Sequence, residues 1–224
     1  MFPPYPISRH SNTYARRIWF SGFGTPRGVT LTSTVNLRPD LSQNQGDPWR
    51  ILAAVCQGAS AALRQFPRLN QFTFWGRLFW AGQPERITVI IENPDSSCDL
   101  VLLKAAHEMT TEDIVKTLKG RIDPIAPNGA RLSFAEHFPF VLYLLERLTG
   151  HYRRDYCLNQ GPIFVSMLGE AEIDDISYTP EHSMALYPGW PKNGTMRLTL
   201  CFNHQLANAR PVARFLIAIK RSLE

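Results

Sequence analysis

Residues 196–223 combine two periodicities that together limit the folds open to this chain. From Met196 to His204 apolar residues take nearly every second position, which is typical of a β-strand with one buried face. Beyond Pro211 the spacing becomes that of an amphipathic helix, whose apolar stripe consists of Val212, Phe215, Leu216 and Ile219. We expect this helix to pack on the sheet, so the fold must hold a helix layer against a sheet layer.

Patterned segments of both kinds recur along the rest of the chain. Alternation over 28–37 predicts a strand that has Val29, Leu31, Ser33, Val35 and Leu37 on one face. Apolar spacing and capping residues predict helices over 14–20, 48–65, a stretch after Thr110, and 138–148. Short strands are predicted over 72–74, 77–80, 86–91, 99–105 and 163–166, and we expect the first four to share a sheet. This irregular mixture favours an α+β fold of two layers, a mixed sheet covered by helices.

The composition favours a single large domain. The chain has 224 residues, 44% of them hydrophobic and 19% charged, which suffices for one well-filled core. The Gly- and Pro-bearing stretches 43–48 and 122–130 are short and lie between patterned segments, so we interpret them as loops. Residues 1–224 are therefore expected to form one domain.

Charge and cysteine usage argue against several kinds of partner. The 24 basic and 19 acidic residues give a net charge of +5 without a dense basic run, so no nucleic acid is expected. The mild excess suits an anionic small molecule such as coenzyme A, and a solvated basic surface explains it equally well. We expect reduced core thiols, with no metal or redox spacing, at Cys56, Cys98, Cys157 and Cys201. Because the apolar runs are short and no secretory peptide precedes them, a cytoplasmic protein without membrane contact is expected.

The end of the last predicted strand carries the first candidate catalytic residue. Alternation places His204 on the same inward face as Leu200 and Phe202. Burial penalises the charged imidazolium, so His204 is expected to be neutral and able to accept a proton. Taken alone, an inward histidine is more often a hydrogen-bonded core residue than a catalytic one. No G-x-G-x-x-G, Walker or zinc-type spacing accompanies it, so nucleotide and metal enzymes lose support.

Four segments resemble one known family in their order along the chain. They are PISR at 6–9, ALRQFPRLN at 62–70, FVSMLG at 164–169 and LTLCFNHQLANARPVARFLIAIKRSLE at 198–224. The set is similar to the acyltransferase domains of 2-oxoacid dehydrogenase complexes, relatives of chloramphenicol acetyltransferase. The last segment resembles their final strand, His-x-x-x-Asp-Gly motif and final helix. The resemblance implies the chloramphenicol-acetyltransferase-like fold, without lipoyl or peripheral-subunit-binding domains, as in stand-alone members.

The resemblance also implies the roles of two residues. In the family the motif histidine is the general base that deprotonates the acceptor, and this role falls on His204. A serine of the Ser-x-Leu-Gly strand end donates to the tetrahedral oxyanion, and this role falls on Ser166. Without the resemblance, Ser166 reads as a hydroxyl bonded to nearby backbone at a strand end.

The motif departs from the family pattern at two positions. Asn208 and Ala209 stand where the family has Asp and Gly. The family Asp pairs with an Arg near the N-terminus and fixes the histidine loop, and that Arg position falls at Ser11 or Asn12. We therefore expect Asn208 to support the site through a neutral hydrogen bond to Asn12 or Ser11. Asn208 also suits a helix N-cap, and Ala209 fits if its φ is negative.

Three hypotheses about function follow. The first is an acyltransferase that moves an acyl group such as acetyl from a thioester, acyl-CoA or an acyl carrier, to a hydroxyl, amine or thiol of a small molecule. A biosynthetic role is expected, with no permanently bound cofactor. The second is a catalytically silent homologue that acts as a structural or binding subunit, and the third is a pocket reused for another reaction. The resemblance further implies homotrimers in which His204 of one subunit faces Ser166 of the next.

Overall fold

The computed structural model describes residues 28–42, 47–74, 77–82, 84–92, 98–120, 161–167, 178, 184–204 and 206–224. The helices predicted over 14–20 and 138–148 lie outside these residues, as do Ser11 and Asn12. The prediction of one domain for 1–224 therefore remains a prediction.

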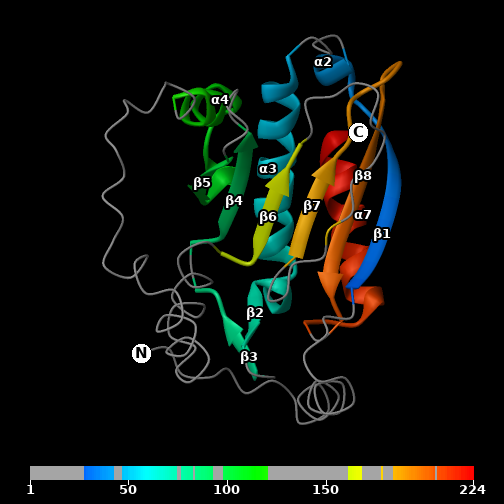
Figure 1. Cartoon of the computed structure of the whole chain (residues 1–224). Helices are drawn as coiled ribbons and strands as arrows, with labels where there is room; N and C mark the ends of the chain where they lie inside the picture. The colour runs from blue at the N-terminus through cyan, green and yellow to red at the C-terminus, as the bar shows by residue number, and fades with distance from the viewer. Residues whose placement is uncertain are drawn as a thin grey trace.

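Six strands form a mixed sheet (Figure 1). In spatial order they are β1 (Gly28–Asn36), β8 (Thr195–Asn203), β7 (Met184–Pro188), β6 (Ile163–Ser166), β4 (Arg86–Glu92) and β5 (Cys98–Lys104). The central strands β4, β6 and β7 run parallel, while every other neighbouring pair is antiparallel. This arrangement confirms the predicted mixed sheet.

The strands predicted over 72–80 do not join that sheet. Instead β2 (Gln71–Phe74) and β3 (Arg77–Trp80) pair only with each other, as an antiparallel ribbon. The expectation that the strands over 72–74, 77–80, 86–91 and 99–105 share one sheet was therefore wrong, because only the last two belong to the six-stranded sheet. Local alternation identifies a strand but does not say which partner it pairs with, because pairing is a long-range property.

Two long helices cover one face of the sheet, α3 (Pro48–Gln65) and α7 (Ala209–Leu223) (Figure 1). The shorter α4 (Thr111–Lys119) packs beside α3, and the remaining helical turns are α2 (Pro39–Ser42), η1 (Pro67–Leu69) and η2 (Ala106–Glu108). Both predicted N-terminal caps are present: Asp47 accepts from the Trp49 amide at 3.1 Å and Thr110 from the Asp113 amide at 3.1 Å. These caps explain why α3 and α4 begin where the sequence predicts.

One hydrophobic core lies between the sheet and these helices. The sheet presents every second side chain to α3 and α7, including Val35 of β1 and Val165 of β6, both fully buried. The predicted stripe of α7 is buried in the same core, and Phe215 meets Phe66 edge-on with ring centroids 6.1 Å apart. The predicted two-layer α+β architecture is thus confirmed.

The end of α7 is bonded to the end of β1. The Leu223 carbonyl accepts from the Arg38 amide at 2.9 Å, and the Glu224 carboxylate accepts from the Asn36 amide at 3.2 Å. Lys220 Nζ donates to the Thr34 carbonyl at 2.7 Å. The side chains of Lys220 and of Glu224, the residue after α7, therefore bond backbone groups of this edge strand.

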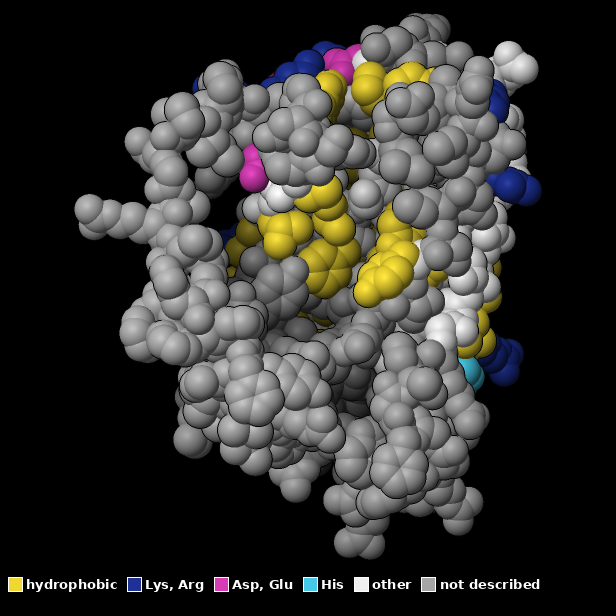
Figure 2. All heavy atoms as spheres, in the orientation of Figure 1, with side chains coloured by type: hydrophobic (Ala, Val, Ile, Leu, Met, Phe, Trp, Pro, Cys, Tyr) yellow, Lys and Arg dark blue, Asp and Glu magenta, His cyan; other side chains and the backbone are white. Residues whose placement is uncertain are grey.

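The opposite face of the sheet is not covered by α3 or α7. Figure 2 views this face and shows hydrophobic side chains gathered over its middle strands. A small apolar cluster lies here, formed by Ala185, Tyr187 and Cys201 with Phe164 packed against it. The alternation of β6, β7 and β8 thus supplies a second, smaller apolar surface on the other side of the sheet.

The described cysteines differ in burial. Cys56 and Cys201 are buried as predicted, whereas Cys98 is exposed at the start of β5, which corrects its assignment to the core. Burial raises the pKa of the Cys56 thiol to about 12, so almost no thiolate exists at Cys56 near pH 8. We expect iodoacetamide at pH 8 to alkylate Cys98 in the native protein and Cys56 only after denaturation, as read from peptide masses. Equal labelling of both thiols in the native protein would contradict the buried position of Cys56.

Candidate active site

His204 lies in a tight turn directly after β8. The Leu206 amide donates to the Asn203 carbonyl at 2.9 Å, which closes a four-residue turn with His204 in its second position. The imidazole lies near the ring of Phe202, with centroids 6.3 Å apart, and its Nδ1 atom is buried. The side chain as a whole is only half-buried. It is less enclosed than alternation predicted, because the strand ends one residue before it.

Ser166 is the last residue of β6 and faces the other side of the sheet. Val165 points into the main core, so Ser166 shares the opposite face with Phe164. Its side chain is half-buried. The Ser166 hydroxyl therefore lies at a strand end, and the pairing of Ser166 with Ile90 of β4 fixes the backbone that carries it.

The register of the sheet separates His204 from Ser166 within one chain. Val165 pairs with Leu186 and Tyr187 pairs with Thr199, so the level of Ser166 on β8 is that of Thr199. His204 follows Thr199 by five residues and lies two strands away from β6. At about 3.3 Å per residue and 4.8 Å per strand, the two residues are roughly 20 Å apart. A single subunit therefore does not bring these two predicted residues together.

Ser166 stands at one end of a row of hydroxyl groups across the same face. When the register is extended by one residue, Ser166 of β6 lies level with Tyr187 of β7, Thr199 of β8 and Thr32 of β1. The two threonine hydroxyls lie 3.1 Å apart. The Tyr187 hydroxyl donates to the Tyr178 carbonyl at 3.1 Å. The pKa of Tyr187 is raised to about 12, chiefly by burial and to a smaller extent by the nearby ionisable groups of Cys201 and Tyr178. Its phenol therefore stays protonated near neutral pH. The surroundings of Ser166 thus include donors that carry no charge.

The altered motif positions begin α7. Asn208 occupies the N-cap position with extended backbone angles, but its exposed side chain makes no capping hydrogen bond within the described chain. Ala209 is the first helical residue and is not among the described residues with positive φ. The condition on Ala209 is therefore met, since a glycine is not required there. The expected bond from Asn208 to Asn12 lies outside the described residues and stays a prediction.

Two polar residues near these sites had no signal in the sequence. Gln71, at the start of β2, donates from Nε2 to the carbonyl of Leu206 in the His204 turn at 2.9 Å. Tyr187 lies beside Ser166, as described above. Neither belongs to a spaced motif, and only the pairing of distant segments shows where they lie.

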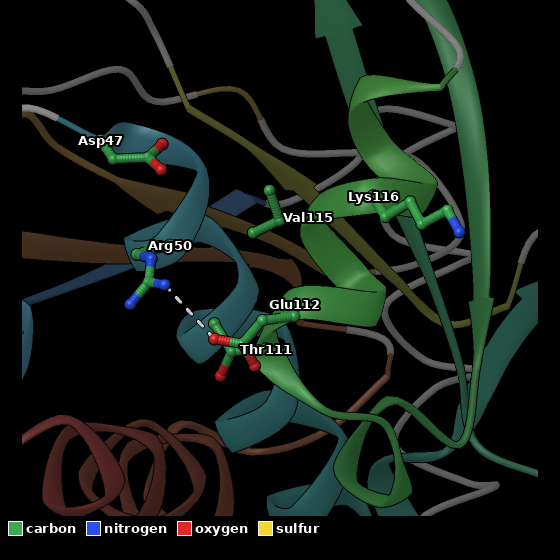
Figure 3. Close-up of a pocket in the computed structure, with 6 residues that line it drawn as sticks. All are labelled: Asp47, Arg50, Thr111, Glu112, Val115 and Lys116. Carbon is green, nitrogen blue, oxygen red and sulfur yellow. Dashed lines mark hydrogen bonds and ion pairs between the residues drawn. The ribbon is translucent and has the colours of Figure 1, made fainter.

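A separate surface pocket of about 280 Å³ lies between the start of α3 and α4 (Figure 3). Its lining comprises Asp47, Arg50, Thr111, Glu112, Val115 and Lys116. Arg50 and Glu112 form an ion pair at 3.3 Å across it, with both side chains exposed. Because its acidic and basic groups are mixed and none of the predicted site residues lines it, we assign it no role in catalysis.

Metal ligation has no support in the described part of the chain. Among those residues, no group of three or more His, Cys, Asp or Glu side chains is placed to hold a metal ion. The helices described above include none that is long and apolar enough to cross a membrane.

Comparisons with known proteins identify the fold. No family model matches the sequence, and no curated protein matches it significantly. Among solved structures, a chloramphenicol acetyltransferase superposes with a TM-score of 0.61 and 14% identity, covering 96% of this chain and 94% of the other. The chain has the chloramphenicol acetyltransferase fold. The fold that the sequence segments implied is thereby confirmed.

Two dihydrolipoamide acetyltransferases, one of them described as probable, share the chloramphenicol acetyltransferase fold with this chain. A probable dihydrolipoamide acetyltransferase from Listeria monocytogenes has a TM-score of 0.60 and 13% identity, covering 99% of this chain and 94% of the other. The dihydrolipoamide acetyltransferase of Azotobacter vinelandii has a TM-score of 0.52 and 13% identity, covering 100% of this chain and 90% of the other. That structure comes from work on the role of a serine, a histidine and an asparagine in its catalytic mechanism.

Proposed function

We propose that this chain is an acyltransferase that transfers an acyl group from a thioester to a hydroxyl, amine or thiol of a small molecule. The observation that carries the proposal is the position of His204, in a closed turn between the buried strand β8 and helix α7 of an acyltransferase-like fold. This position holds the backbone while leaving the imidazole half-buried and within reach of a substrate. Coenzyme A or a carrier-protein arm is the proposed thiol of the donor, and a biosynthetic, cytoplasmic role is part of the proposal.

In the proposed reaction His204 acts as the base. Because its Nδ1 atom is buried, we assign the role to Nε2, which takes the proton of the acceptor as the acceptor attacks the thioester carbonyl. The Ser166 hydroxyl donates to the oxyanion of the tetrahedral intermediate. The C–S bond then breaks with its electron pair on sulfur, and the imidazolium returns the proton to give the thiol. The acyl group ends on the acceptor, and His204 is neutral again.

Asn208 is compatible with this role. In the Azotobacter vinelandii enzyme, the histidine and the asparagine named for the mechanism stand four positions apart, as His204 and Asn208 do here. Ala209 fits the first turn of α7 without strain. The departures at Asn208 and Ala209 therefore do not favour the alternative of a catalytically silent subunit.

The proposed site forms between two copies of the chain. A separation of roughly 20 Å, derived from strand geometry, prevents His204 and Ser166 of one chain from contacting the same thioester carbonyl. A heterologous interface, repeated around a threefold axis, supplies the histidine from one subunit and the serine from the next. We therefore propose a homotrimer with three such sites.

Co-expression of two inactive variants tests this arrangement. His204→Ala and Ser166→Ala are each expected to lack turnover, whereas in randomly mixed trimers about one site in four combines an intact histidine with an intact serine. Release of thiol from an acyl-CoA panel with mixed acceptors should then return to about a quarter of the wild-type rate. Distinct tags on the two variants allow mixed oligomers to be purified.

Two controls show whether recovered turnover comes from sites shared between subunits. Each variant co-expressed with itself should remain inactive, and light scattering should give the mass of a trimer in every case. Purified mixed trimers that stay as inactive as either parent would contradict a site shared between subunits. A stable monomer with full turnover would contradict it as well.

A further inference from the structure

The turn that carries His204 is anchored at its C-terminal end by Leu206. The Leu206 amide closes the turn on Asn203, and the Leu206 side chain is 4% exposed within the main core. Movement of Leu206 would therefore reorient the residues between it and β8, and these include His204. The orientation of the imidazole depends on how firmly Leu206 is held.

The carbonyl of Leu206 has no partner within the adjacent helix. Leu206 lies two residues before the N-cap Asn208, and a carbonyl this far before a helix accepts none of the hydrogen bonds within that helix. Its partner is the side chain of Gln71, whose Nε2 donates at 2.9 Å from a segment 135 residues away. One amide thus ties the His204 turn to the β2–β3 ribbon.

The base of that ribbon is itself fixed. The Asn70 carbonyl accepts from the Ala81 amide at 2.9 Å, and its side-chain Nδ2 donates to the Gly82 carbonyl at 2.8 Å. Gln71 is paired with Trp80 in the next rung. Asn70 is 3% exposed, so these bonds are shielded from water. The backbone of Gln71 is therefore fixed by the hydrogen-bonded pair of strands β2 and β3 rather than lying in a loop.

We propose that Gln71 is a positioning residue for His204. Its neutral amide donates to the Leu206 carbonyl and so maintains the turn. The exposed Asn208 side chain does not do this, since it makes no capping hydrogen bond within the described residues. The catalytic part of this inference rests on the proposed function, since it assumes that His204 is the base. The structural part, control of the turn by Gln71, stands without it.

The test compares two glutamines that make the same kind of bond. Gln71→Met and Gln71→Glu remove the N–H donor at nearly constant length. Gln57→Met removes a bond of the same kind, from Gln57 Nε2 to the Met109 carbonyl at 2.8 Å, together with the bond that Gln57 Oε1 accepts from Thr111 Oγ1 at 3.3 Å. The first readout is hydrogen exchange of the Leu206 amide together with the imidazole NMR signals of His204. We expect both Gln71 variants to speed that exchange about 5–10-fold and to shift the His204 signals, while Gln57→Met changes neither.

The second readout is the separation of kcat from KM. We expect both Gln71 variants to lower kcat about 10-fold or more with little change in the KM of the acyl donor, because geometry rather than binding is lost. Gln57→Met should leave both constants unchanged. Unaltered exchange at Leu206 and unaltered His204 signals in both Gln71 variants would overturn the inference, whatever the turnover.

The two readouts separate failure of the inference from failure of the proposed function. Altered exchange with normal kcat, in a protein that His204→Ala inactivates, would refute the positioning role while leaving His204 as the base. Altered exchange in a protein whose turnover His204→Ala does not change would refute the base assignment and, with it, the catalytic part of the inference. The effect of Gln71 on the turn would then stand as a structural one.

Discussion

Replacement of His204 by alanine should lower kcat about 10²–10⁴-fold, the range that a positioned general base contributes. The loss is confined to the chemical step, because the acceptor keeps its proton while the acyl donor still binds. The fold should persist, since His204 is half-buried in a turn whose anchors are Asn203 and Leu206. Thiol release from the proposed acyl-CoA donor measures kcat, and thermal unfolding measures stability.

A second histidine provides the matched control. The ring nitrogens of His107 lie 2.8 Å from Ser60 Oγ and 3.0 Å from Arg64 on α3. Arg64 only donates, so Nε2 accepts from it and Nδ1–H donates to Ser60. His107→Ala should therefore cost stability, about 1–3 kcal/mol for the lost bonds of buried Ser60, and leave kcat near wild type. Unchanged turnover in His204→Ala, with the true substrate, would refute the base assignment.

Gly161→Ala should destabilise the protein by about 2–5 kcal/mol, the sum expected for a left-handed backbone and an overpacked contact. Gly161 has φ of +84°, and a Cβ there would lie 2.6 Å from the Arg86 carbonyl oxygen and 2.9 Å from its carbonyl carbon. These are backbone atoms of β4, so they cannot move aside as a side chain would. The close approach arises because the chain enters β6 directly beside β4.

Gly82 allows the two contributions to be separated. Its φ is +83°, almost the same, but a Cβ at this position would meet nothing within 4 Å. Gly82→Ala should therefore cost only the backbone term, about 1–2 kcal/mol. Urea unfolding of both variants gives the difference as the cost of crowding Arg86. Equal losses in the two variants would contradict the close packing of β6 against β4.

Elements with strong local signals were predicted well from the sequence. Asp47 and Pro48 mark the start of α3, and the alternation around Val35 marks β1, because caps and periodicity act over a few neighbouring residues. The ribbon of β2 and β3 was placed in the wrong sheet, since nothing local specifies a strand's partner. Cys98 was wrongly assigned to the core for a related reason: burial at the start of β5 depends on what packs there.

The candidate site was predictable only in part. The sequence predicts His204 and Ser166 as site residues through segments that resemble a family, but their separation depends on the pairing of β6, β7 and β8. Gln71 was not found at all, because its contact with Leu206 spans 135 residues and a single glutamine at a strand start forms no pattern. Gln71 is recognised by its contact with Leu206 in the folded structure and not by its residue type.

The pairing of β1 with β8 also determines when the protein can fold during synthesis. β8 is the sheet partner of β1, and the opposed Thr32 and Thr199 are 167 residues apart in sequence. At about 5–20 residues per second, a ribosome takes roughly 10–30 s to make the segment between them. Throughout that time β1 lacks its strand partner, and the core face of α3 lacks α7. The nascent chain therefore exposes aggregation-prone apolar surface until its last elements emerge, which makes chaperone binding during translation an expected requirement for efficient folding.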